Sequence, residues 1–425
     1  MRPLASVSAR AGLLALGGAG FWLAFAAASN NWIVDTSSAP EPSWLRGPLA
    51  GVLPALNDPS FSALLLIMLA GYALAVVGSS HLPERATLVV VFGLVVLFGL
   101  APIVLSSDLF GYVSYARLDV LHGLNPYLHP PSSAPHDAIL PLVFWTDAPS
   151  PYGPLFTALS LPVGAASPPL AVWTLKSLST VSCLLALALI ARAAPRYGRS
   201  ATTAVLLVGG NPLLLVYAVG GGHNDLIVLA LTAGALLLLS RPARAAAGGA
   251  TLALAVAIKL TGTLMLPFAL AGAGRERRTM LAGTLAGAVL ASAITVPLFG
   301  TDVFGQIGRI ATGGDYVIEW SGPDALGRLL GTGVTSGVRL ACAGVAVLVV
   351  LGCLGAVLRG GDWLAAAAIA GLVVLCAIPS LVPWYVAWVL PAAALARGRA
   401  VRVGLLALTA VMVLTRLPIL GFTDY

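Results

Sequence analysis

The chain has 425 residues, of which 59% are hydrophobic and only 9% are charged, and its formal net charge is +7. A soluble globular domain carries about 25% charged residues, so this composition excludes a soluble enzyme and indicates an integral membrane protein. The positive charge does not indicate nucleic-acid binding, because the arginines lie in short loops between apolar runs, the distribution that orients membrane proteins.

Apolar runs that can cross a bilayer recur along the chain and predict an all-α, polytopic bundle of about 11 to 13 membrane helices. The first run has a basic flank but no small-residue cleavage site after it, so we interpret it as a retained helix. We expect one membrane domain, 1–425, with an N-terminal hairpin (11–78), a central module (86–396) and a C-terminal span (401–418). The predicted spans are 11–28, 61–78, 86–105, 170–191, 201–219, 226–240, 279–298, 337–358, 363–378, 384–396 and 401–418.

Short basic loops mark the cytoplasmic side of the predicted bundle. The opposite side then receives most of the acidic, histidine and aromatic residues, so we expect an active site on the extracytoplasmic face of the inner (plasma) membrane. The segments predicted on that face are 30–60, 106–169, 220–225, 301–336, 379–383 and the C-terminus.

Two segments test whether the predicted loops alternate between the two sides of the membrane. Residues 245–271 lie between two basic loops, so they predict a hairpin of two short helices that turns around 258–262. Residues 154–166 are apolar but short. They either re-enter the membrane or cross it as a short helix, and we favour the re-entrant alternative.

Asp108 follows an uncharged run, 86–105, that can span a bilayer, and it opens the long segment 106–169. A carboxylate at a membrane boundary costs free energy unless it is hydrated, paired or used. As a helix cap after two serines, Asp108 would satisfy free backbone donors. As a general base, it would take a proton from a sugar hydroxyl.

The segment that Asp108 opens holds further polar candidates. Asn125 and Tyr127 flank a proline in a turn, and Tyr152 lies on a rigid corner made by two prolines and a glycine. Arg117 is a candidate for binding a phosphate, and Asp119 is a possible second polar contact.

His223, Asn224 and Asp225 follow three glycines, which permit a bend or a close approach to a ligand. The alternative is that these three residues only cap the following helix. Lys259 and Lys176 are the only lysines, and both lie in apolar runs. A lysine in an apolar run indicates a functional partner, and for Lys259 we expect an anionic lipid phosphate. The alternative is that the side chain extends to the membrane–water interface.

Three candidates lie near the end of the chain. Arg328, in a predicted extracytoplasmic loop, is a further candidate for the phosphate. Trp384 and Tyr385 belong either to the aromatic belt of the membrane interface or to a surface that stacks on a sugar ring.

Six short motifs follow one another between residues 86 and 396. They are Ser107-Asp108-Leu109-Phe110-Gly111-Tyr112, Gly123-Leu124-Asn125-Pro126-Tyr127, Ser150-Pro151-Tyr152-Gly153-Pro154, Asn211-Pro212 with Gly222-His223-Asn224-Asp225, Ile258-Lys259-Leu260 and Pro383-Trp384-Tyr385. In this order they resemble the GT-C superfamily of polytopic glycosyltransferases. Within it, the chain is similar to bacterial polyprenol-phosphomannose-dependent α-1,6-mannosyltransferases of envelope assembly.

The resemblance implies a catalytic aspartate at Asp108 and an inverting transfer from a polyprenyl-phosphate sugar to a glycolipid or polysaccharide acceptor, with membrane lipids around the protein. It implies no cofactor beyond this lipid-linked co-substrate. The superfamily often has a paired acidic motif, but Ser106 and Phe110 occupy the flanking positions here, so a divalent metal site is not predicted.

A lipid or glycan transporter without transferase activity is the alternative from another functional class. A transporter needs polar residues arranged at both openings of a pathway, and the cytoplasmic loops are too short to form such an opening. The sequence leaves the sugar, the acceptor, the linkage and the oligomeric state open.

Overall fold

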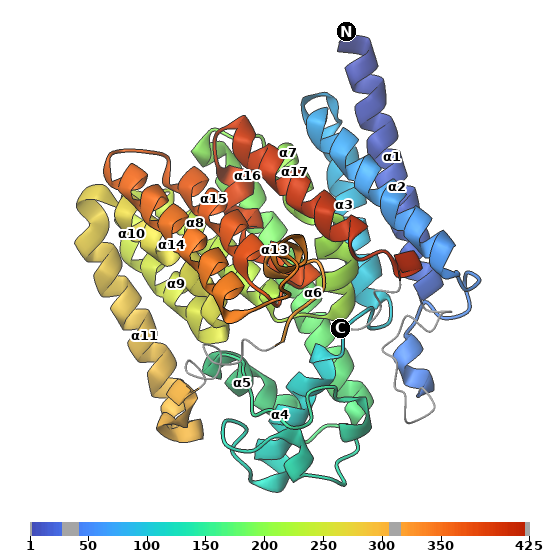
Figure 1. Ribbon diagram of the computed structural model, residues 1–425, viewed down its shortest axis with the longest axis vertical. Helices are drawn as coiled ribbons and strands as arrows, with labels where there is room; N and C mark the ends of the chain where they lie inside the picture. Colours follow the sequence, from blue (N-terminus) through green and yellow to red (C-terminus); the bar gives the residue numbers. More distant parts are fainter. Residues whose placement is uncertain (1, 28–41, 306–315, 421–425) are drawn as a thin grey trace.

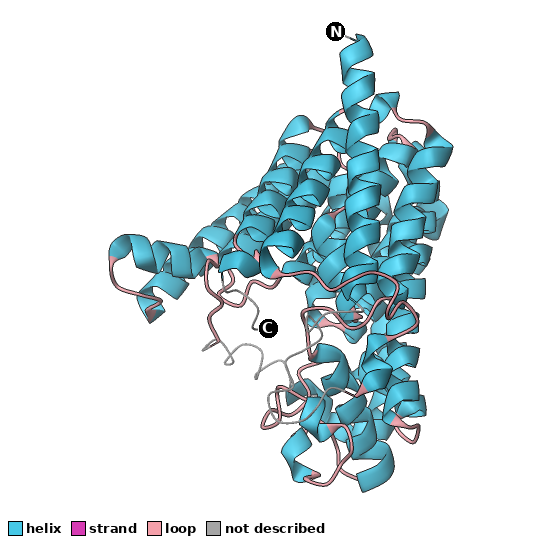
Figure 2. Cartoon of the chain, turned by 90° about the vertical axis from the view of Figure 1, so that its right-hand side faces the viewer, coloured by secondary structure: helices cyan, strands magenta, loops and turns pink. Residues whose placement is uncertain are grey.

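The computed structural model describes residues 2–27, 42–305 and 316–420, and these ranges contain helices and loops but no strand (Figures 1 and 2). The predicted all-α fold is therefore confirmed. Parts of the predicted extracytoplasmic segments 30–60 and 301–336, and the C-terminal residues 421–425, lie outside the described residues.

The α-helices are α1 (Arg2–Ala27), α2 (Asp58–Val77), α3 (Glu84–Leu100), α4 (Asp108–His122), α5 (Pro154–Ser160), α6 (Pro168–Ala193), α7 (Ala201–Gly209), α8 (Asp225–Leu239), α9 (Ala245–Ile258), α10 (Leu266–Gly272), α11 (Arg277–Phe299), α13 (Gly322–Leu330), α14 (Ser336–Leu358), α15 (Trp363–Ala377), α16 (Leu390–Leu395) and α17 (Arg399–Leu414).

Five helical segments of the described chain are long and apolar enough to cross a membrane. They correspond to five of the predicted spans and comprise Ser6–Ala27, Asp58–Val77, Pro168–Tyr197, Gly274–Phe304 and Ser336–Leu358. Shorter apolar helices accompany them. In the last segment only 11% of the apolar window is buried inside the protein, so its outer surface needs lipid rather than water. The protein is therefore a polytopic membrane protein.

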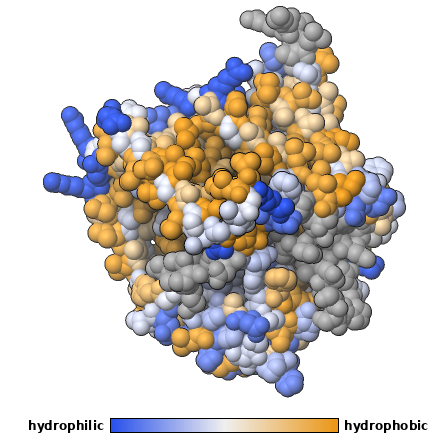
Figure 3. Space-filling model, in the orientation of Figure 1, coloured by the Kyte–Doolittle hydropathy of each residue, from blue (hydrophilic) through white to orange (hydrophobic). Residues whose placement is uncertain are grey.

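The segment between α3 and α6 forms a lobe at one end of the bundle, which contains α4 and, at its border with the bundle, α5 (Figure 1). On the face shown in Figure 3, hydrophobic residues dominate the surface of the bundle, whereas the lobe is visibly more hydrophilic. The long segment that Asp108 opens is therefore folded against the bundle as a lobe of two α-helices, short 3₁₀ turns and loops.

Three predicted spans are interrupted in the structure, and prolines lie at each interruption. The span 86–105 ends at Leu100, and residues 101–107, which we call the strap, run on as buried irregular chain through Pro102. Residues 201–219 divide at Gly210 into α7 and a π-helix, Leu214–Val219. Residues 384–396 are a 3₁₀ helix, Pro383–Trp388, followed by α16. Proline lacks an N–H and disfavours a helical conformation in the preceding residue, which explains these breaks.

The two segments that tested the alternation of sides are also helical. Residues 245–271 form α9 and α10 with a break at Lys259, whose backbone is extended, where the turn was predicted. Residues 154–163 form α5 and one 3₁₀ turn. Their combined length of about 16 Å is too short to cross a hydrocarbon core of about 30 Å.

Candidate active site

Asp108 lies at the junction of the lobe and the bundle. It is the first residue of α4, and the N-cap is Ser107 rather than Asp108. The Asp108 backbone N–H donates to Ser106 Oγ at 3.2 Å. The carboxylate retains 16% exposure, and its Oδ2 lies 3.4 Å from Nδ1 of the fully buried His223. The structure therefore pairs this carboxylate with an imidazole and leaves it accessible.

The His223 ring is held by its surroundings. It stacks on the Trp384 indole with 3.8 Å between ring centroids and an interplanar angle of 19°. A side chain at Gly221 would come within 2.7 Å of His223 Nε2. Both ring nitrogens are buried, and neither makes a hydrogen bond to a described residue, so the 3.4 Å approach of Nδ1 to Asp108 is a close polar contact. The stacking and the close glycine restrict rotation of the ring, so Nδ1 stays directed at Asp108.

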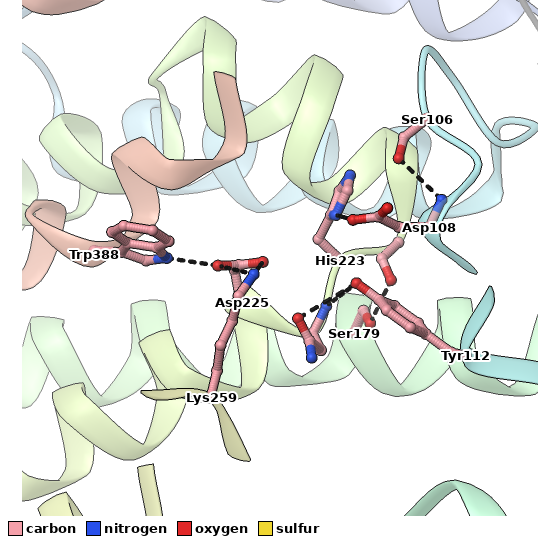
Figure 4. A network of polar contacts seen from close by, with 10 residues as sticks. Ser106, Asp108, Tyr112, Ser179, His223, Asp225, Lys259 and Trp388 are labelled. Carbon is pink, nitrogen blue, oxygen red and sulfur yellow. Dashed lines mark hydrogen bonds and ion pairs between the residues drawn. The ribbon is translucent and has the colours of Figure 1, made fainter. Parts of the chain in front are cut away.

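A second pair of polar side chains lies beside the first (Figure 4). Asp225, the buried first residue of α8, accepts hydrogen bonds from Lys259 Nζ at 2.8 and 3.0 Å. Trp388 Nε1 donates to the same carboxylate. The ammonium also lies 5.1 Å from the Tyr385 ring centroid and 5.8 Å from that of Trp388. Lys259 is therefore directed into the protein, and its side chain is 14% exposed, so it does not extend to the interface.

Tyr112 and Asn224 connect the two pairs. The Tyr112 hydroxyl donates to Asn224 Oδ1 at 3.3 Å and accepts from the Asn224 backbone N–H at 3.4 Å. The Tyr152 ring packs edge-on against Tyr112 at 4.7 Å. The Asn224 side-chain nitrogen is buried and has no partner in the described part of the chain. These contacts bind α4 of the lobe to the start of α8 in the bundle.

The corner that carries Tyr152 docks on the break at Lys259. The Gly153 N–H donates to the Ile258 carbonyl at 3.2 Å. A Cβ at Gly153 would lie 2.3 Å from the Ala257 carbonyl oxygen, so this approach requires glycine. The lobe therefore touches the segment that positions the lysine.

The arrangement can accept a proton and stabilise an anion. Asp108 is an accessible carboxylate with a histidine behind it, which suits a general base. Lys259 is a largely buried lysine, 14% exposed, and an ammonium in such a position suits the stabilisation of a developing negative charge. The groups come from α4, the start of α8, the break at Lys259 and the 3₁₀ helix Pro383–Trp388.

Two predicted candidates on α4 lie away from this cluster. Arg117 is nine residues beyond Asp108, or about 13 Å along the helix, and its guanidinium pairs with Asp137 at 2.8 Å and donates to the Ala166 carbonyl. Asp119 is half-buried and about 16 Å along the helix. Burial raises the pKa of Asp119.

Three other candidates make contacts outside the Asp108 cluster. Asn125 donates to the Phe299 carbonyl at 2.8 Å, and the buried Tyr127 hydroxyl donates to the Tyr152 carbonyl at 3.1 Å. Arg328 lies on the surface of α13, where it pairs with Glu319 and Asp324. The structure gives Asn125 and Tyr127 structural contacts and does not bring Arg328 to the Asp108 cluster.

Two aromatic residues of the cluster were not among the predicted site residues, although Tyr112 belongs to the first of the six motifs. Tyr112 is four residues after Asp108, so both lie on one face of a helix. Trp388 is four residues after Trp384 in the same aromatic segment. The four-residue spacing from a predicted site residue was the sequence feature that could have identified Tyr112 and Trp388.

The Arg117–Asp137 pair predicts pH-dependent stability. Burial opposes ionisation of Asp137, but hydrogen bonds from Arg117 and His122 outweigh it and lower the pKa of Asp137. The charged form therefore stabilises the fold fully above the unfolded pKa of about 4, and this contribution is lost as the pH falls through the lower folded value. We expect Asp137→Asn to lower the melting temperature most near neutral pH, with a gap to wild type that narrows below about pH 4.

The measurement is thermal unfolding of the purified protein in detergent across this pH range. Asp147→Asn is the matched control, because Asp147 is an exposed acid of the same lobe, and we expect it to follow wild type. A gap between Asp137→Asn and wild type that does not change with pH would contradict the prediction.

Comparison with known proteins identifies a family. The MptA_B family model, described as alpha-(1->6)-mannopyranosyltransferase, N-terminal domain, matches residues 14–275, which is more than half of the chain. The matched range includes Asp108, His223, Asp225 and Lys259, whereas Trp384 lies beyond it. No curated protein and no solved structure matches the chain.

Proposed function

Since the chain belongs to the alpha-(1->6)-mannopyranosyltransferase family, we propose that it transfers mannose from a polyprenyl-phosphate donor to an envelope glycolipid or polysaccharide through an α-1,6 linkage. The observation that supports this proposal is the accessible Asp108 carboxylate beside His223, next to the buried Asp225–Lys259 pair. This arrangement would supply a base and a cation, the two groups that we assign to such a transfer.

Asp108 would act as the general base. An acceptor hydroxyl attacks the anomeric carbon, its proton passes to Asp108, and a new C–O bond forms on the face opposite the leaving group. This single displacement inverts the anomeric centre. His223, held 3.4 Å from the carboxylate by its stacking on Trp384, would orient Asp108.

Lys259 would bind the leaving phosphate. As the bond between the anomeric carbon and the phosphate oxygen breaks, a phosphodiester with one negative charge becomes a phosphomonoester with two. A nearby ammonium stabilises that added charge. Asp225 and the rings of Tyr385 and Trp388 hold the ammonium in place. A polyprenyl phosphate is a good leaving group, so no general acid is needed.

The site would face the extracytoplasmic side. The basic loops that mark the cytoplasmic side and the lobe that holds Asp108 fall on opposite sides of the predicted bundle. Nucleotide sugars are absent on the extracytoplasmic side, so a lipid-linked donor in the inner membrane suits this location. The acceptor is then a glycan of the cell envelope.

The test is incubation of purified protein with polyprenyl-phosphate-mannose and a mannan acceptor. We expect donor consumption together with an α-1,6-mannosylated product, identified by mass spectrometry and linkage analysis. Movement of the lipid across vesicles without a new glycosidic bond would instead identify the transporter. Consumption of a nucleotide sugar in place of the lipid donor would also overturn the proposal.

A further inference from the structure

Lys176 is a fully buried lysine of α6 that the proposed chemistry does not use. A lysine inside a membrane helix costs free energy unless its ammonium is hydrogen-bonded or has a function. Its Nζ donates to the carbonyl of Ala101 and, at 2.6 Å, to the carbonyl of Pro102. These two carbonyls follow the end of α3, where a helix presents partial negative charge.

The acceptors of Lys176 belong to the strap, residues 101–107, which leads directly into Asp108. The strap is buried along its whole length, and its Val104 N–H donates to the Gly220 carbonyl at 3.2 Å. Leu105 in the strap has a φ of +54°, which is strained for a residue other than glycine. Such a conformation persists only where its surroundings enforce it.

The same face of α6 also holds the segment before His223. Ser179, one helical turn beyond Lys176, donates its hydroxyl to the Gly222 carbonyl at 3.0 Å. Gly222 has a φ of +72°, and a Cβ there would lie 3.4 Å from Lys176 Cγ. Lys176 and Ser179 therefore bind the backbone on both sides of the Asp108–His223 contact.

We propose that Lys176 is a positioning residue, which fixes the strap so that Asp108 lies at working distance from His223 and the acceptor hydroxyl. The proposal rests on the proposed function, because it assigns Lys176 an effect on the transfer step. The role is geometric, and Lys176 itself touches no substrate. A displacement of about 1 Å in a catalytic group can cost about a hundredfold in rate.

The experiment compares Lys176→Met and Lys176→Gln with wild type in the purified full-length protein. Methionine matches the length of the lysine stem but removes both hydrogen bonds of Nζ, whereas glutamine keeps an N–H donor group. We expect Lys176→Met to lower kcat by about 10- to 100-fold, with KM for the mannosyl donor within about threefold of wild type. Lys176→Gln should recover part of kcat.

Hydrogen–deuterium exchange provides a readout that does not depend on activity. In Lys176→Met we expect faster exchange of the amides in the strap, with α9 and α11 unchanged. Ser182→Ala is the matched control, because Ser182 is a buried polar residue of the same helix away from these contacts. It should leave both kcat and strap exchange unchanged.

The outcomes separate this inference from the proposed function. Normal kcat, a change in KM alone, or normal strap exchange in Lys176→Met would overturn the role of Lys176. If wild type transfers no mannose, the proposed function fails, and faster strap exchange in Lys176→Met would then support the structural placement alone.

Discussion

Asp108→Asn should reduce mannosyl transfer by about a thousandfold or more, since a positioned general base contributes about 10²- to 10⁴-fold. Asparagine has nearly the same shape as aspartate but cannot accept the proton of the acceptor hydroxyl. The contacts that hold α4 in place, from the Asp108 backbone N–H to Ser106 Oγ and from Tyr112 to Asn224, remain available. The loss should therefore appear in kcat, while the protein stays folded in the membrane.

The measurement is initial rate against donor concentration, together with membrane abundance and melting temperature. Asp147→Asn is the matched control, because it makes the same substitution at an exposed position of the same lobe. We expect its kcat to equal that of wild type. Near-normal transfer by Asp108→Asn would remove Asp108 from the reaction and refute the general-base assignment.

Lys259→Met should lower kcat by about 10²- to 10³-fold, the usual loss when one group that stabilises transition-state charge is removed. The substitution also leaves Asp225 as an uncompensated carboxylate with a fully buried side chain. Breaking such a pair costs about 3–5 kcal/mol of stability, so reduced activity by itself has two explanations.

The double variant Lys259→Met/Asp225→Asn separates these explanations. It removes both charges, so the melting temperature should recover relative to the single variant, while transfer stays low because no cation remains for the phosphate. Arg275→Met, at an exposed position on the opposite side of the predicted topology, is the control for the loss of one positive charge. If activity recovers together with stability in the double variant, Lys259 has a structural role only.

The sequence predicted the membrane class and much of the helical layout because lipid imposes a simple requirement. Every backbone polar group within the hydrocarbon core must be satisfied internally, so long apolar runs become helices. Residues 170–191 and 337–358 are therefore predictable from composition alone. The break at Lys259 was also predictable, since two flanking basic loops excluded a single crossing.

The interrupted spans were not predictable in the same way. Apolar composition does not distinguish a continuous helix from a buried irregular segment such as the strap. The strap exists because Lys176 and the Gly220 region supply hydrogen-bond partners to its backbone. These partners are more than sixty residues away in sequence, so local propensity contains no information about them.

The same distinction between sequence and tertiary structure applies to the candidate site. The sequence by itself determined that this is a polytopic membrane protein and that Asp108, His223, Asp225 and Lys259 are polar residues in need of partners, because isolated polar groups in apolar surroundings are costly. Only the tertiary structure decided which partners they have. It paired Asp108 with His223 and Asp225 with Lys259, and it placed Arg117 with Asp137 and Arg328 on the surface. The physical reason is that a charge can be satisfied by any complementary group, and the packing of distant helices selects the one that lies within reach.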